Sequence, residues 1–125
     1  MVFITMFILN SDQVCANQKN KSVQCNKEKI VFDVNAIDRN GLVGPLDGKV
    51  SVVYEFCIPY ENKYLEEVKS IDPLLNCYHG SKGRIGCQEN EYLCLGNTHD
   101  KDFKSKLCQL SNREYIKQIA QCFFE

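Results

Sequence analysis

Eight cysteines, at positions 15, 25, 57, 77, 87, 94, 108 and 122, are the residues of this 125-residue chain with the most distinctive chemistry. Cys57, Cys87 and Cys94 fall at strand ends that we expect to meet at one edge of a sheet. A disulfide of Cys94 with Cys57 or with Cys87 is one interpretation, provided the Cα atoms come within about 7 Å. A thiolate site for zinc or copper, or for redox exchange, is the alternative. Inert or disulfide-bonded cysteines are favoured, because buried thiols usually behave as small hydrophobic groups.

A second set of potential metal ligands is expected at the opposite edge of the same sheet. Cys77, His79, His99 and Cys122 offer two sulfur and two nitrogen donors, which would suit tetrahedral zinc. The four residues are scattered in the sequence, so a surface His99 beside a helix cap is the favoured interpretation. His99 with Asp100 also offers a proton-transfer pair, although no nucleophile is tied to it by sequence.

One glycine-rich stretch has the composition of an anion-binding loop. In Gly80-Ser81-Lys82-Gly83-Arg84 the glycines Gly80 and Gly83 allow close backbone approach, while Lys82 and Arg84 supply positive charge. A flexible turn leading into a strand would use the same residues, and we favour that interpretation.

Signatures of common enzymes are missing. The chain contains no Cys-x-x-Cys pair, His-Glu-x-x-His run, phosphate-loop signature or nucleophile elbow. The charge balance of 15 Lys plus Arg against 16 Asp plus Glu shows no basic face for nucleic acid, and no apolar run reaches the roughly 18 residues that span a bilayer.

The N-terminal residues resemble a secretory signal. Val2 to Leu9 is apolar, and Val14-Cys15-Ala16 has the small residues that signal peptidase reads, which predicts a signal peptide over residues 1–16 with cleavage after Ala16. A buried N-terminal strand is the alternative. Cleavage would remove Cys15 and leave an odd number of cysteines, and Asn20 begins a glycosylation sequon just beyond the cut.

The remaining chain predicts a polar lead-in over residues 17–28 and one α+β domain over residues 29–125. Lys29 to Ile37 alternates like a strand. The predicted elements that follow are a strand over Lys49–Ile58, a helix over Glu61–Ile71, strands over Cys77–Cys87 and Glu91–Thr98 joined by residues 88–90, a helix over Asp100–Leu110 and a strand over Ile119–Phe124. This β-α-β-β-α-β order predicts a ferredoxin-like sandwich, a four-stranded antiparallel sheet with two helices on one face and an additional N-terminal strand.

Fold alone does not choose a function. We expect a small secreted or lumenal cysteine-rich binding domain without catalysis or cofactor, with an unknown protein partner and no nucleic acid. An intracellular thiol protein that binds zinc or copper or carries out redox exchange, in the cytoplasm or mitochondria, is the second hypothesis. A small hydrolase or transferase that uses His99 and Asp100 is the third.

Overall fold

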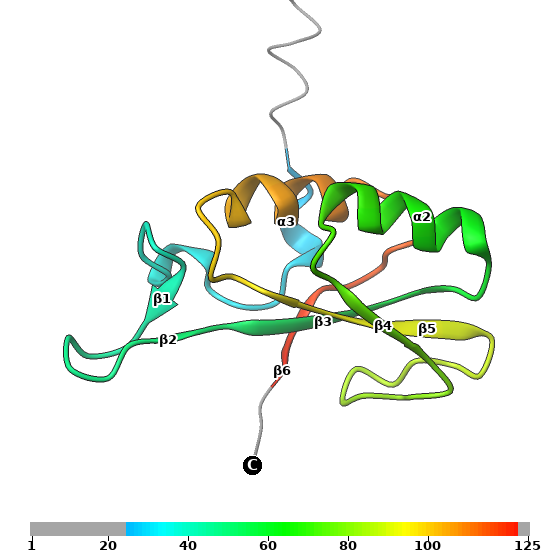
Figure 1. Ribbon diagram of the computed structural model, residues 1–125, viewed down its shortest axis with the longest axis horizontal. Coiled ribbons are helices and arrows are strands. Elements are labelled where there is room, and N and C mark those ends of the chain that lie inside the picture. The colour runs from blue at the N-terminus through cyan, green and yellow to red at the C-terminus, as the bar shows by residue number, and fades with distance from the viewer. Residues whose placement is uncertain (1–24, 123–125) are drawn as a thin grey trace, which may run out of the picture.

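The computed structural model describes residues 25–122 (Figure 1). The predicted signal peptide, Asn20 and the predicted end of the last strand at residues 123–124 lie outside this range. The elements follow in the order η1 (Lys27–Lys29), η2 (Val34–Ala36), β1 (Leu42–Val43), β2 (Val50–Ser51), β3 (Val53–Pro59), α2 (Asn62–Ile71), β4 (Asn76–His79), β5 (Glu91–Asn97), α3 (Phe103–Ser111) and β6 (Ala120–Cys122).

The main sheet has four antiparallel strands in the order β4-β5-β3-β6, and both helices cover the same face (Figure 1). β3 lies inside the sheet, with Phe56 opposite Cys94 of β5 and Tyr54 opposite Gln121 of β6. β1 and β2 pair separately as a two-stranded sheet. The mixed α/β class and the predicted strand and helix order after Lys49 are confirmed.

The core lies between the main sheet and the helices because β3 alternates as its sequence predicts. Val52, Tyr54, Phe56 and Ile58 are buried as expected, and they meet Val68 of α2 and the predicted α3 stripe of Phe103, Leu107 and Leu110. In a continuous strand over Lys49–Ile58 Val50 would share this face, but it is 62% exposed. The strand is interrupted at Val52, whose N–H donates to the Thr98 hydroxyl at 2.9 Å, so Val50 belongs to the small sheet.

The predicted N-terminal strand over Lys29–Ile37 is wrong. The Asp33 side chain accepts a hydrogen bond from the Asn35 N–H at 3.0 Å, which starts the 3₁₀ turn η2. Extended pairing is limited to one isolated parallel bridge between Ile30 and Ile119. The alternating residues Ile30, Phe32 and Val34 nevertheless pack against the core, with Phe32 stacked beside Tyr54, and Ile37 at the end of the segment is buried.

The strand predicted over Cys77–Cys87 is also too long. β4 ends at His79, and Gly80 and Gly83 then have φ values of +87° and +62°, which leave the extended region. The connection to β5 is therefore the long loop 80–90, and the short hairpin predicted at residues 88–90 is wrong. The loop lies on the face of the sheet opposite the helices (Figure 1).

Candidate functional site

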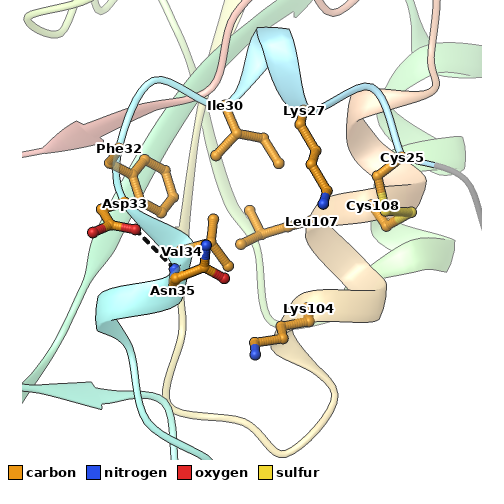
Figure 2. Close-up of a pocket in the computed structure, with 10 residues that line it drawn as sticks. All are labelled: Cys25, Lys27, Ile30, Phe32, Asp33, Val34, Asn35, Lys104, Leu107 and Cys108. Carbon is orange, nitrogen blue, oxygen red and sulfur yellow. Dashed lines mark hydrogen bonds between the residues drawn. A yellow bond between two sulfur atoms is a disulfide. The ribbon is translucent and has the colours of Figure 1, made fainter.

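A cleft of about 400 Å³ opens between the N-terminal segment and α3 (Figure 2). One wall comes from η1, η2 and the residues between them, and the other comes from α3. The lining residues are Cys25, Lys27, Ile30, Phe32, Asp33, Val34, Asn35, Lys104, Leu107 and Cys108. This volume is within the usual range for sites that hold small molecules.

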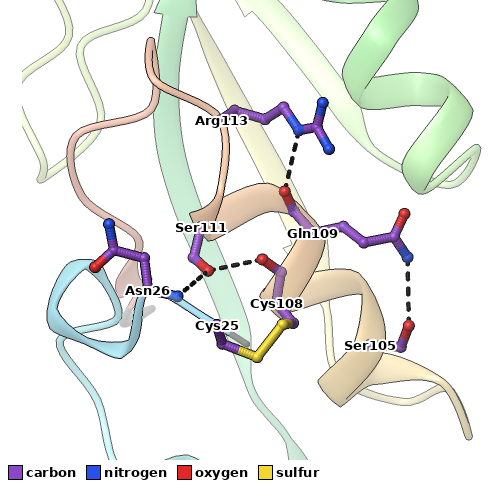
Figure 3. Close-up of a disulfide and its surroundings, with 7 residues drawn as sticks. All are labelled: Cys25, Asn26, Ser105, Cys108, Gln109, Ser111 and Arg113. Atoms are coloured by element: carbon purple, nitrogen blue, oxygen red, sulfur yellow. Dashed lines mark hydrogen bonds between the residues drawn. A yellow bond between two sulfur atoms is a disulfide. The ribbon is translucent and has the colours of Figure 1, made fainter. Parts of the chain in front are cut away.

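The wall formed by the N-terminal segment is fixed by a disulfide between Cys25 and Cys108, residues that are 83 positions apart. Next to it, the Ser111 hydroxyl accepts the Asn26 N–H at 3.1 Å and donates to the Cys108 carbonyl at 2.7 Å (Figure 3). The Lys29 ammonium donates to the Arg113 carbonyl at 2.8 Å. One covalent bond and two long-range hydrogen bonds therefore attach the segment to the C-terminal part of α3 and to Arg113 just beyond it.

The side chains of the cleft divide into an apolar wall and a basic rim. Figure 2 shows Ile30, Val34 and Leu107 pointing into the middle of the cleft, with Lys27 and Lys104 on different sides of it. The acidic residue of the cleft, Asp33, already accepts the Asn35 N–H. The cleft thus combines apolar surface with an excess of positive charge, an arrangement that favours an elongated molecule with an acidic headgroup and an apolar body.

No protein-family model, curated protein or solved structure matches this chain. Inferences about function therefore rest on its own side chains. Two disulfides are typical of a protein from an oxidising compartment and are rare in the reduced cytosol. Across residues 25–122, none of the helices has the length and apolar character to cross a bilayer.

The second disulfide joins Cys57 and Cys87, with Cα atoms 5.6 Å apart. Both predicted pairings with Cys94 are wrong. Cys94 lies opposite Phe56 in the register, so its side chain is on the helix-covered face, whereas Cys57 is on the other face. Cys57, Cys87 and Glu91 place their ligand atoms within 4.8 Å of one another, but the two sulfurs are bonded and so do not serve as thiolate ligands.

The structure does not bring Cys77, His79, His99 and Cys122 together. Cys77 is on β4 and Cys122 is on β6, the two edge strands, which lie about 14 Å apart across three strand spacings. His79 pairs with Tyr92 near one end of β5, and His99 lies beyond the other end, which is roughly 17 Å away along the strand. The His79 ring is stacked on Tyr60, with ring centroids 3.7 Å apart.

The loop predicted as an anion site packs against the second face of the sheet. A Cβ at Gly83 would be 2.8 Å from the Leu93 side chain and 3.1 Å from a Glu55 oxygen, so Gly83 allows the loop to approach β3 and β5 closely. Burial and a hydrogen bond with Glu55 raise the pKa of the Cys122 thiol, and the positive charge of Arg84 partly opposes this increase. Anion binding by Gly80, Lys82, Gly83 and Arg84 stays a prediction.

The Asp100 carboxylate has two other partners, and a proton-transfer pair of His99 with Asp100 stays a prediction. Its carboxylate is ion-paired with Lys106 and accepts the Asp102 N–H at 2.8 Å near the start of α3. The hydrogen bond from Lys106 lowers the pKa of Asp100, and the same bond raises the pKa of Lys106. Lys106 also lies 3.6 Å from the buried Asp72, which accepts a hydrogen bond from Tyr54.

Sequence reasoning missed the cleft itself. Lys27 lies in the predicted polar lead-in, Lys104 lies in the helix predicted over Asp100–Leu110, and Ile30, Phe32 and Val34 fit one face of the predicted N-terminal strand. The one available signal is Cys25, because a cysteine in an otherwise polar segment is a point at which a disulfide could tether it. Its partner, Cys108, is not indicated by spacing, because 83 residues separate the two.

Proposed function

We propose that this chain is a small secreted or lumenal binding domain of ferredoxin-like architecture, without catalysis, which holds an amphipathic organic acid in the cleft between the N-terminal segment and α3. The strand order β4-β5-β3-β6 with both helices on one face supports the architecture. The two disulfides support an oxidising compartment.

The observation that carries the proposed activity is the presence of an apolar wall and two lysines in one cleft. A carboxylate placed between Lys27 and Lys104 makes charge-assisted hydrogen bonds, while its alkyl or aryl body covers Ile30, Val34 and Leu107. A purely polar anion would leave the apolar wall exposed to water. An apolar molecule without an acidic group would form no charge-assisted hydrogen bond with the lysines. A protein partner, which the composition suggests, stays a prediction.

Calorimetric titration of the folded protein with octanoate tests the ligand class, with acetate and octan-1-ol as comparison ligands. We expect one saturable site for octanoate and weaker binding of both comparison ligands. The double variant Lys27→Gln/Lys104→Gln should weaken octanoate binding by about tenfold or more, since two charge-assisted contacts are lost.

A matched control is available on the same protein. Lys63→Gln/Lys101→Gln changes the net charge equally at two exposed lysines that do not line the cleft. Equal affinity for octanoate in the wild type and in both double variants would contradict the proposal, as would tighter binding of octan-1-ol than of octanoate.

The compartment has its own test. Titration of thiols in denatured, unreduced protein should find at most four, namely Cys77, Cys94, Cys122 and, where it is retained, Cys15. A mass spectrum of the native protein reports cleavage after Ala16 and a glycan at Asn20 directly. Seven or eight free thiols would contradict an origin in an oxidising compartment.

A further inference from the structure

Cys77 and Cys94 lie directly opposite each other on the antiparallel strands β4 and β5. Directly opposed residues in such a pair have Cα atoms about 4.5–5.5 Å apart, a separation that a disulfide bridges without backbone movement. Neither residue belongs to the two disulfides of the described chain. The register therefore holds a dithiol in a geometry suited to bond formation.

The two thiols have different surroundings. Cys77 is partly exposed on the edge strand, whereas Cys94 is fully buried in the core. A hydrogen bond with Cys94 lowers the pKa of Cys77 despite partial burial, and the charge of Lys69 on α2 acts in the same direction. The same hydrogen bond, together with burial, raises the pKa of Cys94. Cys77 is thus the accessible nucleophile and Cys94 the protected thiol behind it.

We propose that Cys77 and Cys94 form a thiol–disulfide exchange site that reacts with low-molecular-weight disulfides and closes into a third, cross-strand disulfide. The Cys77 thiolate attacks one sulfur of the small disulfide, breaks its S–S bond and releases one thiolate. Cys94 then passes its proton to that thiolate and attacks the Cys77 sulfur, which releases the second small thiolate. The proton that Cys77 lost is taken up by this second product, so the protein loses two electrons and two protons and the small disulfide becomes two thiols.

Closure of this site would fasten the edge of the sheet. β4 has four residues, and β5 is the only strand with which it pairs in the four-stranded sheet. A bond between Cys77 and Cys94 would hold β4 to β5 and enclose the loop 80–90, whose Cys87 is already bonded to β3. The oxidised form should consequently melt several degrees higher than the dithiol form.

Equilibration in glutathione buffers tests the proposal. The folded protein is incubated at increasing ratios of glutathione disulfide to glutathione, quenched under denaturing conditions with N-ethylmaleimide, digested and mapped by mass spectrometry. A peptide pair cross-linked through Cys77 and Cys94 should increase with the ratio, while the bonds Cys25–Cys108 and Cys57–Cys87 stay intact over the same range.

Variants separate the two roles. In Cys94→Ala, Cys77 should stop at the mixed disulfide with glutathione, which does not accumulate in the wild type. In Cys77→Ala, Cys94 should stay a thiol throughout, and Cys122→Ala should behave as the wild type; circular dichroism checks that each is folded. Alkylation of both cysteines in the most oxidising buffer would overturn the proposal, as would equal accumulation of the mixed disulfide in the wild type and Cys94→Ala.

Discussion

The carboxylate of Glu55 accepts a 2.6 Å hydrogen bond from the backbone N–H of Ile85, and this contact joins the central strand β3 to the loop 80–90. Glu55 is 1% exposed, although it lies on the face of the sheet away from the helices. The loop with Gly83 and Ile85 is what covers it, and the Cys57–Cys87 disulfide holds the same loop two residues further along each segment. The loop 80–90 therefore partly covers the second face of the sheet, although its sequence resembles that of an exposed turn.

Replacement of Glu55 should loosen this loop. Glu55→Ala leaves the Ile85 N–H without its acceptor and should lower the free energy of unfolding by about 1–3 kcal/mol. Glu55→Gln keeps an acceptor oxygen and should cost less. Hydrogen exchange of the Ile85 amide, followed by NMR, should accelerate strongly in the alanine variant and less in the glutamine variant; equal rates in all three proteins would show that the contact does not hold the loop.

Gly41 should be the least replaceable glycine among the described residues. Its φ is +80°, and a Cβ there would lie 1.7 Å from the Thr98 carbonyl oxygen. Thr98 in turn donates to the Gly41 carbonyl and accepts the Val52 N–H, so the backbone has no room to shift. Gly41→Ala should cost more than about 3 kcal/mol in urea unfolding, since a backbone clash adds to the left-handed strain.

Gly80→Ala is the matched control for Gly41→Ala. Gly80 has a similar φ of +87°, with nothing within 4 Å of the position of a Cβ. Gly80→Ala should lower the free energy of unfolding only by the backbone strain, about 1–2 kcal/mol. Equal losses in the free energy of unfolding at the two positions would contradict a steric role for the close approach of Gly41 to Thr98.

Loss of the first disulfide should weaken both stability and the cleft. A bond that closes a loop of this length restricts the unfolded chain, so Cys25→Ala/Cys108→Ala should lower the free energy of unfolding by about 2–5 kcal/mol. The variant should also bind octanoate less tightly, because one wall of the cleft loses its covalent attachment. Chemical denaturation and calorimetry measure the two effects, and unchanged octanoate affinity in a folded variant would place the ligand elsewhere.

The ion pair of Asp100 and Lys106 should make the free energy of unfolding depend on pH at both the acidic and the basic end of the range. The pKa of Asp100 is lowered from 3.8, so its contribution is present above that value and is lost as the pH falls through the folded-state pKa. The pKa of Lys106 is raised from 10.5, so its contribution is present below that value and is lost as the pH rises through the folded-state pKa. Stability from this pair should therefore be constant between these limits.

Lys106→Met removes the pair and tests this dependence. The variant should be about 1–3 kcal/mol less stable at pH 7, since Asp72 and Asp100 both lose a cationic neighbour. Thermal unfolding from pH 2 to 11 should show that the difference from the wild type narrows at both extremes. A constant difference over the whole range would contradict an electrostatic origin.

The order of elements was predictable because each main strand and helix carries its own hydrophobic period. β3 alternates along its length, and Phe103, Leu107 and Leu110 repeat at helical spacing, so local sequence and global fold agree. The N-terminal segment misled the prediction because Ile30, Phe32 and Val34 alternate while Asp33 bends the chain through its side chain. Every second side chain of this segment is partly buried because it packs on the core. Within residues 25–122, the segment has no neighbouring strand with which it could form a regular ladder of backbone hydrogen bonds.

The disulfides and the cleft were less predictable, because they depend on where loops run in space. The pairing of Cys57 with Cys87 requires β4 to stop at His79 and the following loop to return beneath β3, and neither follows from cysteine spacing. The cleft requires the segment that begins at Cys25 to lie along α3. Alternation along β3 puts Glu55 on the face away from the helices, and only the covering loop explains why a carboxylate is buried there.

An NMR titration of ¹⁵N-labelled, disulfide-bonded protein with octanoate tests the central claim most directly. Binding in the cleft predicts saturable shifts at the amides of Ile30, Val34, Lys104 and Leu107, with little change in the loop 80–90 or at the Tyr60–His79 stack, and loss of those shifts in Lys27→Gln/Lys104→Gln. Absence of saturable shifts at the cleft, or shifts of equal size in the wild type and the double variant, would contradict a binding function for this site.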